Sequence, residues 1–362
     1  MSVADDLLDQ PGDDSPLSPS MVSSTASWFA AGVLLVMLAA CLLAGWTPLG
    51  FSILTVFLFA GPHNWSEARY FLSRMPARWG RLMGFFALGI GGTIVLTGAF
   101  AALPAIGAAA GWEREDWLIA YATWNTVFMA WILTLVYLRS QQNPKRDWGW
   151  VYPVGFGLMA LNWLWPQAWD LALVYIHPCI ALWFLDRELG QKKPEWQPTY
   201  RACLCILPVL LGLLWWQLAA SPNLPGEDAL SMRLAPYYGP EHQAALNSRI
   251  AYHAGAGVLE NISTHLLVST HTFLEMLHYG VWLVAIPLVA WREEPWNLEH
   301  VPLARETSGW RWFVIGVLCL GGMAVLGFWA GFAANYPLTR DIYFTVAMLH
   351  VLAEVPFLLR LL

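Results

Sequence analysis

Apolar segments of about 18 to 25 residues recur along the chain from Trp28 to the C-terminus. A helix of about this length spans a hydrocarbon core of about 30 Å, because each residue adds about 1.5 Å. Of the 362 residues, 57% are hydrophobic and only 12% are charged, against the roughly 25% charged residues of a soluble domain. The chain is therefore predicted to be an all-α integral membrane protein in contact with the lipid bilayer along most of its length.

Ten segments are predicted to cross the membrane and to form one helical domain over residues 28–362. The second segment turns polar after Gly61-Pro62-His63. We expect it to continue as a helix, because proline is tolerated in membrane helices whose neighbours satisfy the freed carbonyl. The predicted spans are residues 28–46, 50–75, 82–103, 117–138, 150–165, 169–185, 201–219, 262–290, 310–333 and 341–360.

The orientation follows from lysine and arginine, which gather in the loops after the even-numbered spans and are sparse in the opposite loops. Basic residues favour the cytoplasmic side, so both termini are predicted to be cytoplasmic. The segment at about 220–261 is then external, as a loop punctuated by proline and glycine or as a cap on the membrane surface. Residues 1–27 are rich in Ser, Pro and Asp and are predicted to form a disordered acidic tail. This tail has no signal-peptide pattern, and we expect a bacterial inner membrane.

Composition also excludes some classes of site. All five cysteines lie within apolar segments, so neither a disulfide framework nor a thiolate metal motif is expected. The net charge is −6, and five aspartates in the first fourteen residues supply much of it. No basic patch indicates a nucleic-acid partner.

Histidine and glutamate recur together within four of the predicted spans. An ionisable residue inside a membrane costs about 2.5 to 3.5 kcal/mol on insertion scales, so such residues mark functional positions. Their spacing is i, i+4 in spans 2 and 10 and i, i+4, i+7 in span 8, which places each set on one helix face. The residues are His63 and Glu67 in span 2, His177 in span 6, His271, Glu275 and His278 in span 8, and His350 and Glu354 in span 10.

These four spans run in the same direction, so depths can be compared. Counted from the outer ends, most of the side chains lie about eight to thirteen residues deep, a range of only about 8 Å. Imidazoles and carboxylates that meet at one level suit iron, zinc, copper or manganese. The predicted metal ligands are His63, His177, His271, His278 and His350, and the predicted catalytic residues are Glu67, Glu275 and Glu354.

Other interpretations of the same residues stay open. A lone histidine in a membrane helix is more often hydrogen-bonded to a neighbouring helix than bound to metal. Glu67 and Glu354 also fit a role in orienting the histidines. The Glu275-x-x-His278 pair has the spacing of di-iron carboxylate sites in helix bundles, a spacing that also arises by chance. The remaining histidines lie in predicted loops or near the outer interface and are not expected to be ligands: His242, His253, His265 and His300.

The Gly61-Pro62-His63 step is similar to the Pro-His elements of the Brp/Blh carotenoid-cleaving membrane oxygenases. That resemblance implies iron held by histidines among transmembrane helices. It covers three residues and lacks the Gly and Asp that follow in that family, so it assigns no site residue here.

Three functions are compatible with this pattern. The first is a membrane-embedded metal-dependent oxidoreductase that acts on a lipid-soluble substrate, with iron as the expected metal and haem as a variant. The second is a proton-coupled transporter or channel that uses the carboxyl and imidazole groups as a relay, although no internal repeat supports an inverted-repeat transporter. The third is a non-catalytic subunit whose polar helix faces contact another membrane protein.

Overall fold

The computed structural model describes residues 19–76, 78–224, 227–238, 243–289 and 298–361, and these residues contain helices and no strand. The fold is therefore all-α, as the apolar segments predict. Four short helical elements lie between the long ones: α9 (Ala229–Tyr238), α10 (Gln243–His253), η5 (Leu298–His300) and α13 (Pro302–Glu306).

Within the described ranges, eight helical segments are long and apolar enough to cross a membrane. Some of them are built from consecutive elements. The eight are α1 (Pro19–Trp46), η1 (Gly80–Leu82) with α3 (Met83–Ala110), α4 (Arg114–Gln142), α6 (Pro166–Lys192), α7 (Gln197–Leu204) with α8 (Ile206–Leu218), α11 (Thr264–Gly280) with η3 (Val281–Ala285) and α12 (Ile286–Val289), α14 (Ser308–Ala334) and α15 (Tyr336–Leu361).

The other two predicted spans also coincide with helices. One is α2 (Pro48–Arg74), which continues through Pro62 as expected but is polar in its second half. The other is α5 (Val151–Leu164), which is apolar but has only 14 residues. Eight crossings thus satisfy length and composition, and the count of ten stays a prediction.

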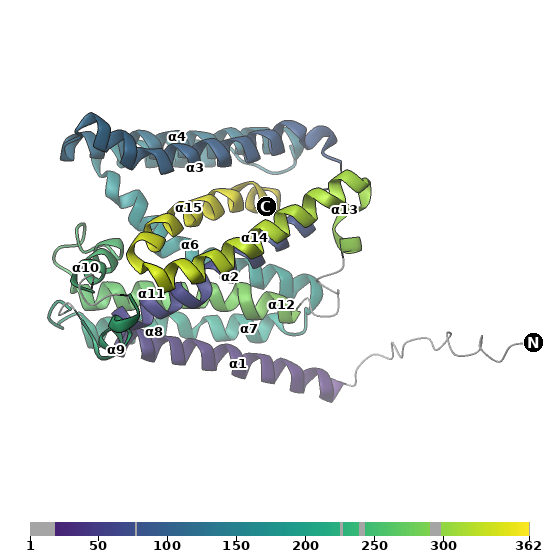
Figure 1. Cartoon of the computed structure of the whole chain (residues 1–362). Coiled ribbons are helices and arrows are strands. Elements are labelled where there is room, and N and C mark those ends of the chain that lie inside the picture. Colours follow the sequence, from purple (N-terminus) through teal and green to yellow (C-terminus); the bar gives the residue numbers. More distant parts are fainter. Residues whose placement is uncertain (1–18, 77, 225–226, 239–242, 290–297, 362) are drawn as a thin grey trace, which may run out of the picture.

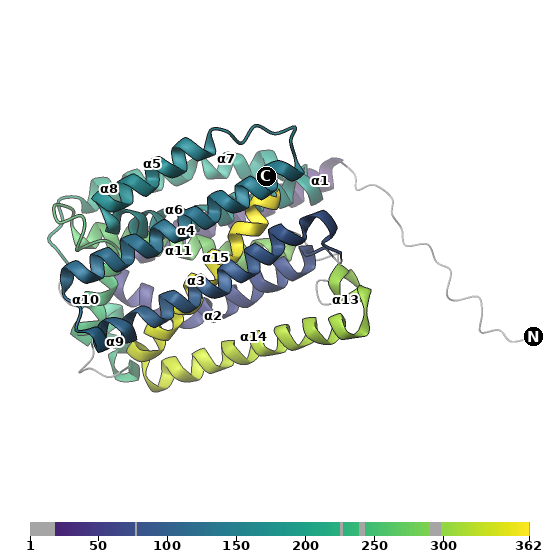
Figure 2. The ribbon, with the colours of Figure 1, turned by 90° about the horizontal axis from the view of Figure 1, so that it is seen from above.

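The long helices lie side by side with their axes roughly aligned (Figures 1 and 2). Helices α3 and α4 form one edge of the bundle, and α15 packs against α3. The short helices α9 and α10 lie together at one end of the bundle, whereas α13 lies at the opposite end (Figure 1). Helix α15 ends towards the same end of the bundle as α13, which is also the end where α1 begins (Figures 1 and 2). This arrangement agrees with an even number of crossings.

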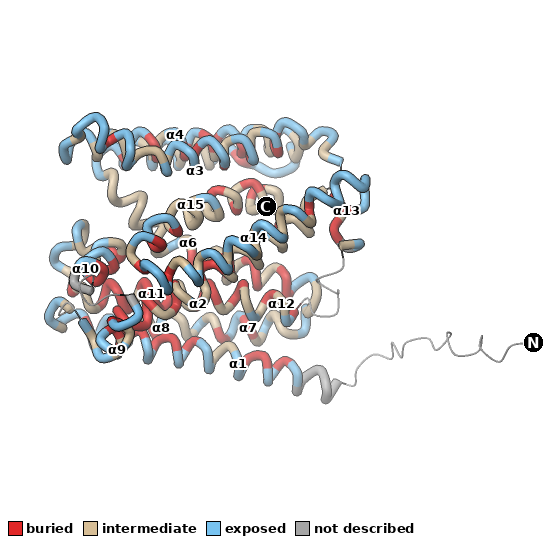
Figure 3. The backbone as a smooth tube through the Cα atoms, in the orientation of Figure 1, coloured by how far each residue is buried: buried red, intermediate tan, exposed pale blue. Residues whose placement is uncertain are grey.

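Helix α2 occupies the interior of the bundle. It packs against α11, α14 and α15, and its buried residues run from Pro48 to Phe71. Helix α14 has only Val314 and Phe332 buried and exposes the rest of its apolar surface (Figure 3). The contrast explains why the polar second half of α2 is tolerated, since neighbouring helices rather than lipid surround it.

Local chemistry sets several helix ends. The Ser263 side chain caps α11 by accepting from the backbone N–H of His265, a contact typical of helix starts. Glu113 and Asp116 form a reciprocal capping box at the start of α4. Helix α3 ends at Gly111, whose φ of 65° suits glycine.

Two predicted segments outside the spans can be compared with the structure. Residues 1–18 of the predicted tail lie outside the described residues, and α1 begins at Pro19, before the predicted start of the first span. The segment at about 220–261 carries α9 and α10 at one end of the bundle. This end is the one that the distribution of basic residues predicts to be external.

Candidate metal centre

Four histidines from four helices converge inside the bundle. They are His63 of α2, His177 of α6, His278 of α11 and His350 of α15. The ring centroid of His63 lies 5.2 Å from that of His278 and 5.1 Å from that of His350. The ring of His177 lies 4.9 Å from His278 and 5.0 Å from His350. We call this group the four-histidine cluster.

The ring of His63 is oriented by its own helix. Its Nδ1 lies 3.1 Å from the backbone carbonyl of Phe59, and since a carbonyl only accepts, Nδ1 carries the proton. The other nitrogen, Nε2, is then a lone-pair donor, and it is buried without a hydrogen-bond partner among the described residues. A histidine held in one tautomer by a backbone carbonyl is the usual arrangement of a metal ligand.

His177 is oriented by a carboxyl group instead. Its Nδ1 lies 3.2 Å from Oε2 of Glu354, one turn beyond His350 on α15. Its Nε2 faces Nε2 of His350 at 3.0 Å. The carboxylate–histidine contact thus turns the second nitrogen of His177 towards the cluster, as outer carboxylates do in metal sites.

His278 lies next to an irregular turn of its helix. Helix α11 passes into the π-helical segment η3 two residues after His278, and Pro287 in α12 explains the irregularity because it removes one helical N–H. The Ser66 hydroxyl donates to the backbone carbonyl of Trp282 within the π segment at 2.8 Å. Single π turns often occur at functional sites, and both ring nitrogens of His278 are buried without a hydrogen-bond partner in the described part of the chain.

The spacing of the donor atoms suits one metal ion. Ligand atoms of His63, Glu67, His278 and His350 all lie within 4.8 Å of one another. Two ligands on one ion lie about 4.2 Å apart when opposite and about 3.0 Å apart at right angles, since metal–nitrogen bonds are about 2.1 Å long. The observed distances therefore need only a small contraction to enclose an ion, and the partnerless imidazole nitrogens provide the lone pairs.

Two of the three predicted catalytic glutamates lie beside the cluster. Glu67 and Glu354 are 1% and 2% exposed, and their carboxyl groups are close enough to interact electrostatically. Glu67 is among the groups that can hold an ion, whereas Glu354 contacts His177. Glu67 is therefore a candidate ligand together with His63, His278 and His350, and Glu354 is a positioning residue beside His177.

The structure does not bring the other two predicted residues, His271 and Glu275, to the cluster. The ring of His271 instead lies 5.0 Å from that of His253 and 6.3 Å from that of Tyr175. His271 and Glu275 line a separate small cavity with His253 and Arg340. Sequence reasoning set His253 aside because it lies in a predicted loop. In the sequence, Arg340 is one of the few basic residues on the side predicted to be external, and no motif marks it as part of a site.

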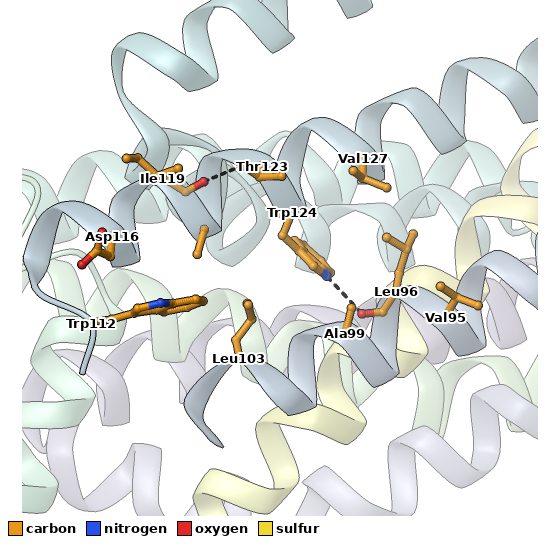
Figure 4. Close-up of a pocket in the computed structure, with 11 residues that line it drawn as sticks. Val95, Leu96, Ala99, Leu103, Trp112, Asp116, Ile119, Thr123, Trp124 and Val127 are labelled. Atoms are coloured by element: carbon orange, nitrogen blue, oxygen red, sulfur yellow. Dashed lines mark hydrogen bonds between the residues drawn. The ribbon is translucent and has the colours of Figure 1, made fainter. Parts of the chain in front are cut away.

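A larger recess lies away from both groups, between α3 and α4 (Figure 4). Its lining is apolar apart from Asp116 and Thr123 at the α4 side, and the indole N–H of Trp124 donates to the Leu96 carbonyl at 3.0 Å beneath it. It contains no histidine and none of the predicted site residues. This groove of about 480 Å³ offers apolar volume at the edge of the bundle rather than chemistry.

No protein-family model, curated protein or solved structure matches this chain. The functional argument therefore depends on the geometry of the cluster and on the chemistry of its side chains.

Proposed function

We propose that this protein is a membrane-embedded, metal-dependent oxidoreductase in which the four-histidine cluster holds one non-haem metal ion. The observation that supports the proposal most directly is the convergence of four imidazoles. The Nδ1 atom of His63 is hydrogen-bonded to a backbone carbonyl, and that of His177 lies 3.2 Å from a Glu354 carboxyl oxygen. Burying that many polar rings without ligation would leave several hydrogen-bonding atoms unsatisfied, at a cost of about 1 to 3 kcal/mol each.

Iron is the metal that we propose. Imidazole nitrogen suits iron, copper, zinc and nickel, and the cluster contains no thiolate that would favour softer ions. Of these metals, iron and copper carry out redox chemistry, and the two nearby carboxyl groups favour iron as the harder ion. Ring centroids about 5 Å apart leave no space for a porphyrin between imidazoles, so a bare ion fits better than haem.

A lipid-soluble substrate follows from where the cluster lies. His63, Glu67 and Glu354 are all at most 2% exposed, and many large apolar side chains are exposed on the outer faces of the helices. A substrate dissolved in the bilayer reaches such a centre laterally, without crossing a polar interface. The apolar groove between α3 and α4 is one surface on which a long apolar molecule can lie.

The direct test is elemental analysis of detergent-purified full-length protein. We expect about one iron per chain in the wild type, and loss of the metal in His63→Ala and His350→Ala, with helical content unchanged by circular dichroism. His265→Ala is the matched control, since the His265 ring bonds the Gly45 carbonyl away from the cluster. Folded wild-type protein without metal, even after anaerobic addition of ferrous iron, would overturn the proposal.

A proton-coupled transporter is the second candidate. It is favoured by the buried carboxyl groups of Glu67 and Glu354 and the half-buried one of Glu275, which lie on three of the four helices that meet at the cluster. This function requires pH-dependent flux in proteoliposomes and no bound metal, so the same elemental analysis separates the two candidates. A stable co-purifying membrane protein together with metal-free histidines would instead indicate a structural subunit.

A further inference from the structure

A second group of polar residues lies between the four-histidine cluster and the α9–α10 end of the bundle. These residues line a small cavity with about 10 Å³ of space, roughly the room for one water molecule. We call it the Arg340 chamber. Its polar lining consists of Ser52 of α2, His253 of α10, His271 and Glu275 of α11, and Arg340 and Tyr343 of α15.

Arg340 gives the chamber a fixed positive charge near the surface. The residue is 5% exposed, its guanidinium lies 4.4 Å from the ring centroid of Phe344, and it forms no ion pair within 4 Å among the described residues. The next residue, Asp341, is about half exposed and pairs with Arg249 of α10 at 2.8 Å. The buried Arg340 is thus followed directly by an exposed residue, at the end of the bundle that is predicted to be external.

Glu275 links this chamber to the cluster. Its Oε1 accepts from the Tyr279 hydroxyl at 2.7 Å, and the Tyr279 ring lies 4.5 Å from that of His63. Its Oε2 faces the chamber, 3.8 Å from Nε2 of His271, and has no hydrogen-bond partner among the described residues. One carboxyl group therefore lines the chamber and is joined to the cluster through the Tyr279 side chain.

Electrostatics explains what such a carboxyl can do. In a medium of low dielectric constant, charges interact strongly and an uncompensated charge is costly. An electron added to a buried metal ion removes one positive charge, which favours uptake of one proton close by. Glu67 and Glu354 are nearer to the ion, but neither lines the chamber.

We propose, on the basis of the proposed metal centre, that Glu275 takes up one proton through the Arg340 chamber when the metal ion gains one electron. The electron comes from a one-electron reductant such as dithionite, and the proton comes from water at the α9–α10 end. Oxidised metal and carboxylate become reduced metal and carboxylic acid, so charge in the interior is conserved. The groups that face Glu275 are His271 and Tyr279 of its own helix, Arg340 and Tyr343 of α15, His253 of α10 and Ser52 of α2.

The test is a redox titration of iron-loaded, full-length protein at several pH values, with dithionite as the reductant. In the wild type we expect the equilibrium constant for reduction of the metal to fall about tenfold for each unit that the pH rises, over part of the pH range. Glu275→Gln should keep its iron and lose this dependence, whereas Glu275→Asp should retain it. Asp341→Asn is the control, because its carboxyl group is exposed and pairs outside the chamber.

The outcomes separate the two proposals. Iron-loaded Glu275→Gln protein with the wild-type pH dependence overturns this inference alone, and so does a pH-independent wild type. Loss of the dependence in Glu67→Gln but not in Glu275→Gln also overturns it and assigns the proton to the cluster. Wild-type protein without metal overturns the proposed function first, and this inference with it.

Discussion

Helix α11 carries two histidines, His271 and His278, on the same face, but their surroundings differ. His271 and His278 are seven residues apart, so they lie two turns apart on one face of the helix. Around His278, three other helices present imidazoles at ring distances of 4.9 to 6.1 Å. Around His271, the neighbours are His253, Glu275 and the buried guanidinium of Arg340.

The difference shows that neighbouring helices, not the helix face alone, decide which histidine can bind a metal ion. The lone pairs of the four imidazoles and the two carboxyl groups favour a cation, whereas the fixed charge of Arg340 disfavours one. The same face of α11 thus contributes to a candidate metal centre at one depth and to a polar chamber at another. A variant in one of the two regions therefore has a natural reference in the other.

The largest effect is expected from removal of a ligand. His278→Ala should lower metal affinity by more than about 100-fold, since even residues outside the ligand set typically contribute 10- to 100-fold. His271→Ala should leave the metal content unchanged. Elemental analysis of the two purified variants checks both, and equal loss of metal in both would show that the two regions form one site.

Metal should also stabilise the fold through the cluster alone. A ligand present at about 100 times its dissociation constant stabilises the folded state by about 2.7 kcal/mol. A chelator should therefore lower the melting temperature of the wild type and of His271→Ala. It should have no effect on His63→Ala, and a chelator effect in that variant would contradict the assignment.

A smaller effect is expected from the carboxyl group that orients His177. Glu354→Gln should weaken metal binding by about 10- to 100-fold, because it replaces the carboxyl group that orients Nδ1 of His177. Glu275→Gln, which changes the chamber, should leave the affinity unchanged. Competition with a chelator of known affinity measures both, and a stronger effect of Glu275→Gln would reverse the assigned roles.

The smallest effect is expected from the link between the two regions. Tyr279→Phe removes the hydrogen bond to Glu275 and keeps the ring beside His63, so the free energy of unfolding should fall by about 1 kcal/mol. The metal content should not change. Thermal denaturation with and without metal tests this, and loss of metal would indicate that the Tyr279 hydroxyl supports the cluster itself.

Much of the fold follows from the sequence because lipid as a solvent leaves few alternatives to helices. Each of the ten predicted spans coincides with a helix, and α2 continues through Pro62 as expected. Hydropathy alone does not establish α2 and α5 as crossings. The first is polar because other helices surround it, and the second is short. The two helices in the segment at about 220–261 are also not evident from a pattern dominated by proline and glycine.

The helix face and approximate depth of the candidate ligands can be predicted from the sequence, but the residues that meet in space cannot. Helical spacing places His271 and His278 on one face, and depth counting places His63, His177, His271 and His350 within about 8 Å of depth. Neither says how the helices are rotated towards one another. The tertiary arrangement turns His63, His177, His278 and His350 together and leaves His271 beside Arg340.

X-ray absorption spectroscopy of the iron-loaded wild-type protein tests the central claim most directly. The account predicts a first shell dominated by nitrogen at about 2.1 Å, with the outer-shell scattering of four imidazole rings. His271→Ala should give the same spectrum. A first shell that contains sulfur, or outer-shell scattering from no more than one or two imidazoles, would contradict a centre built from His63, His177, His278 and His350.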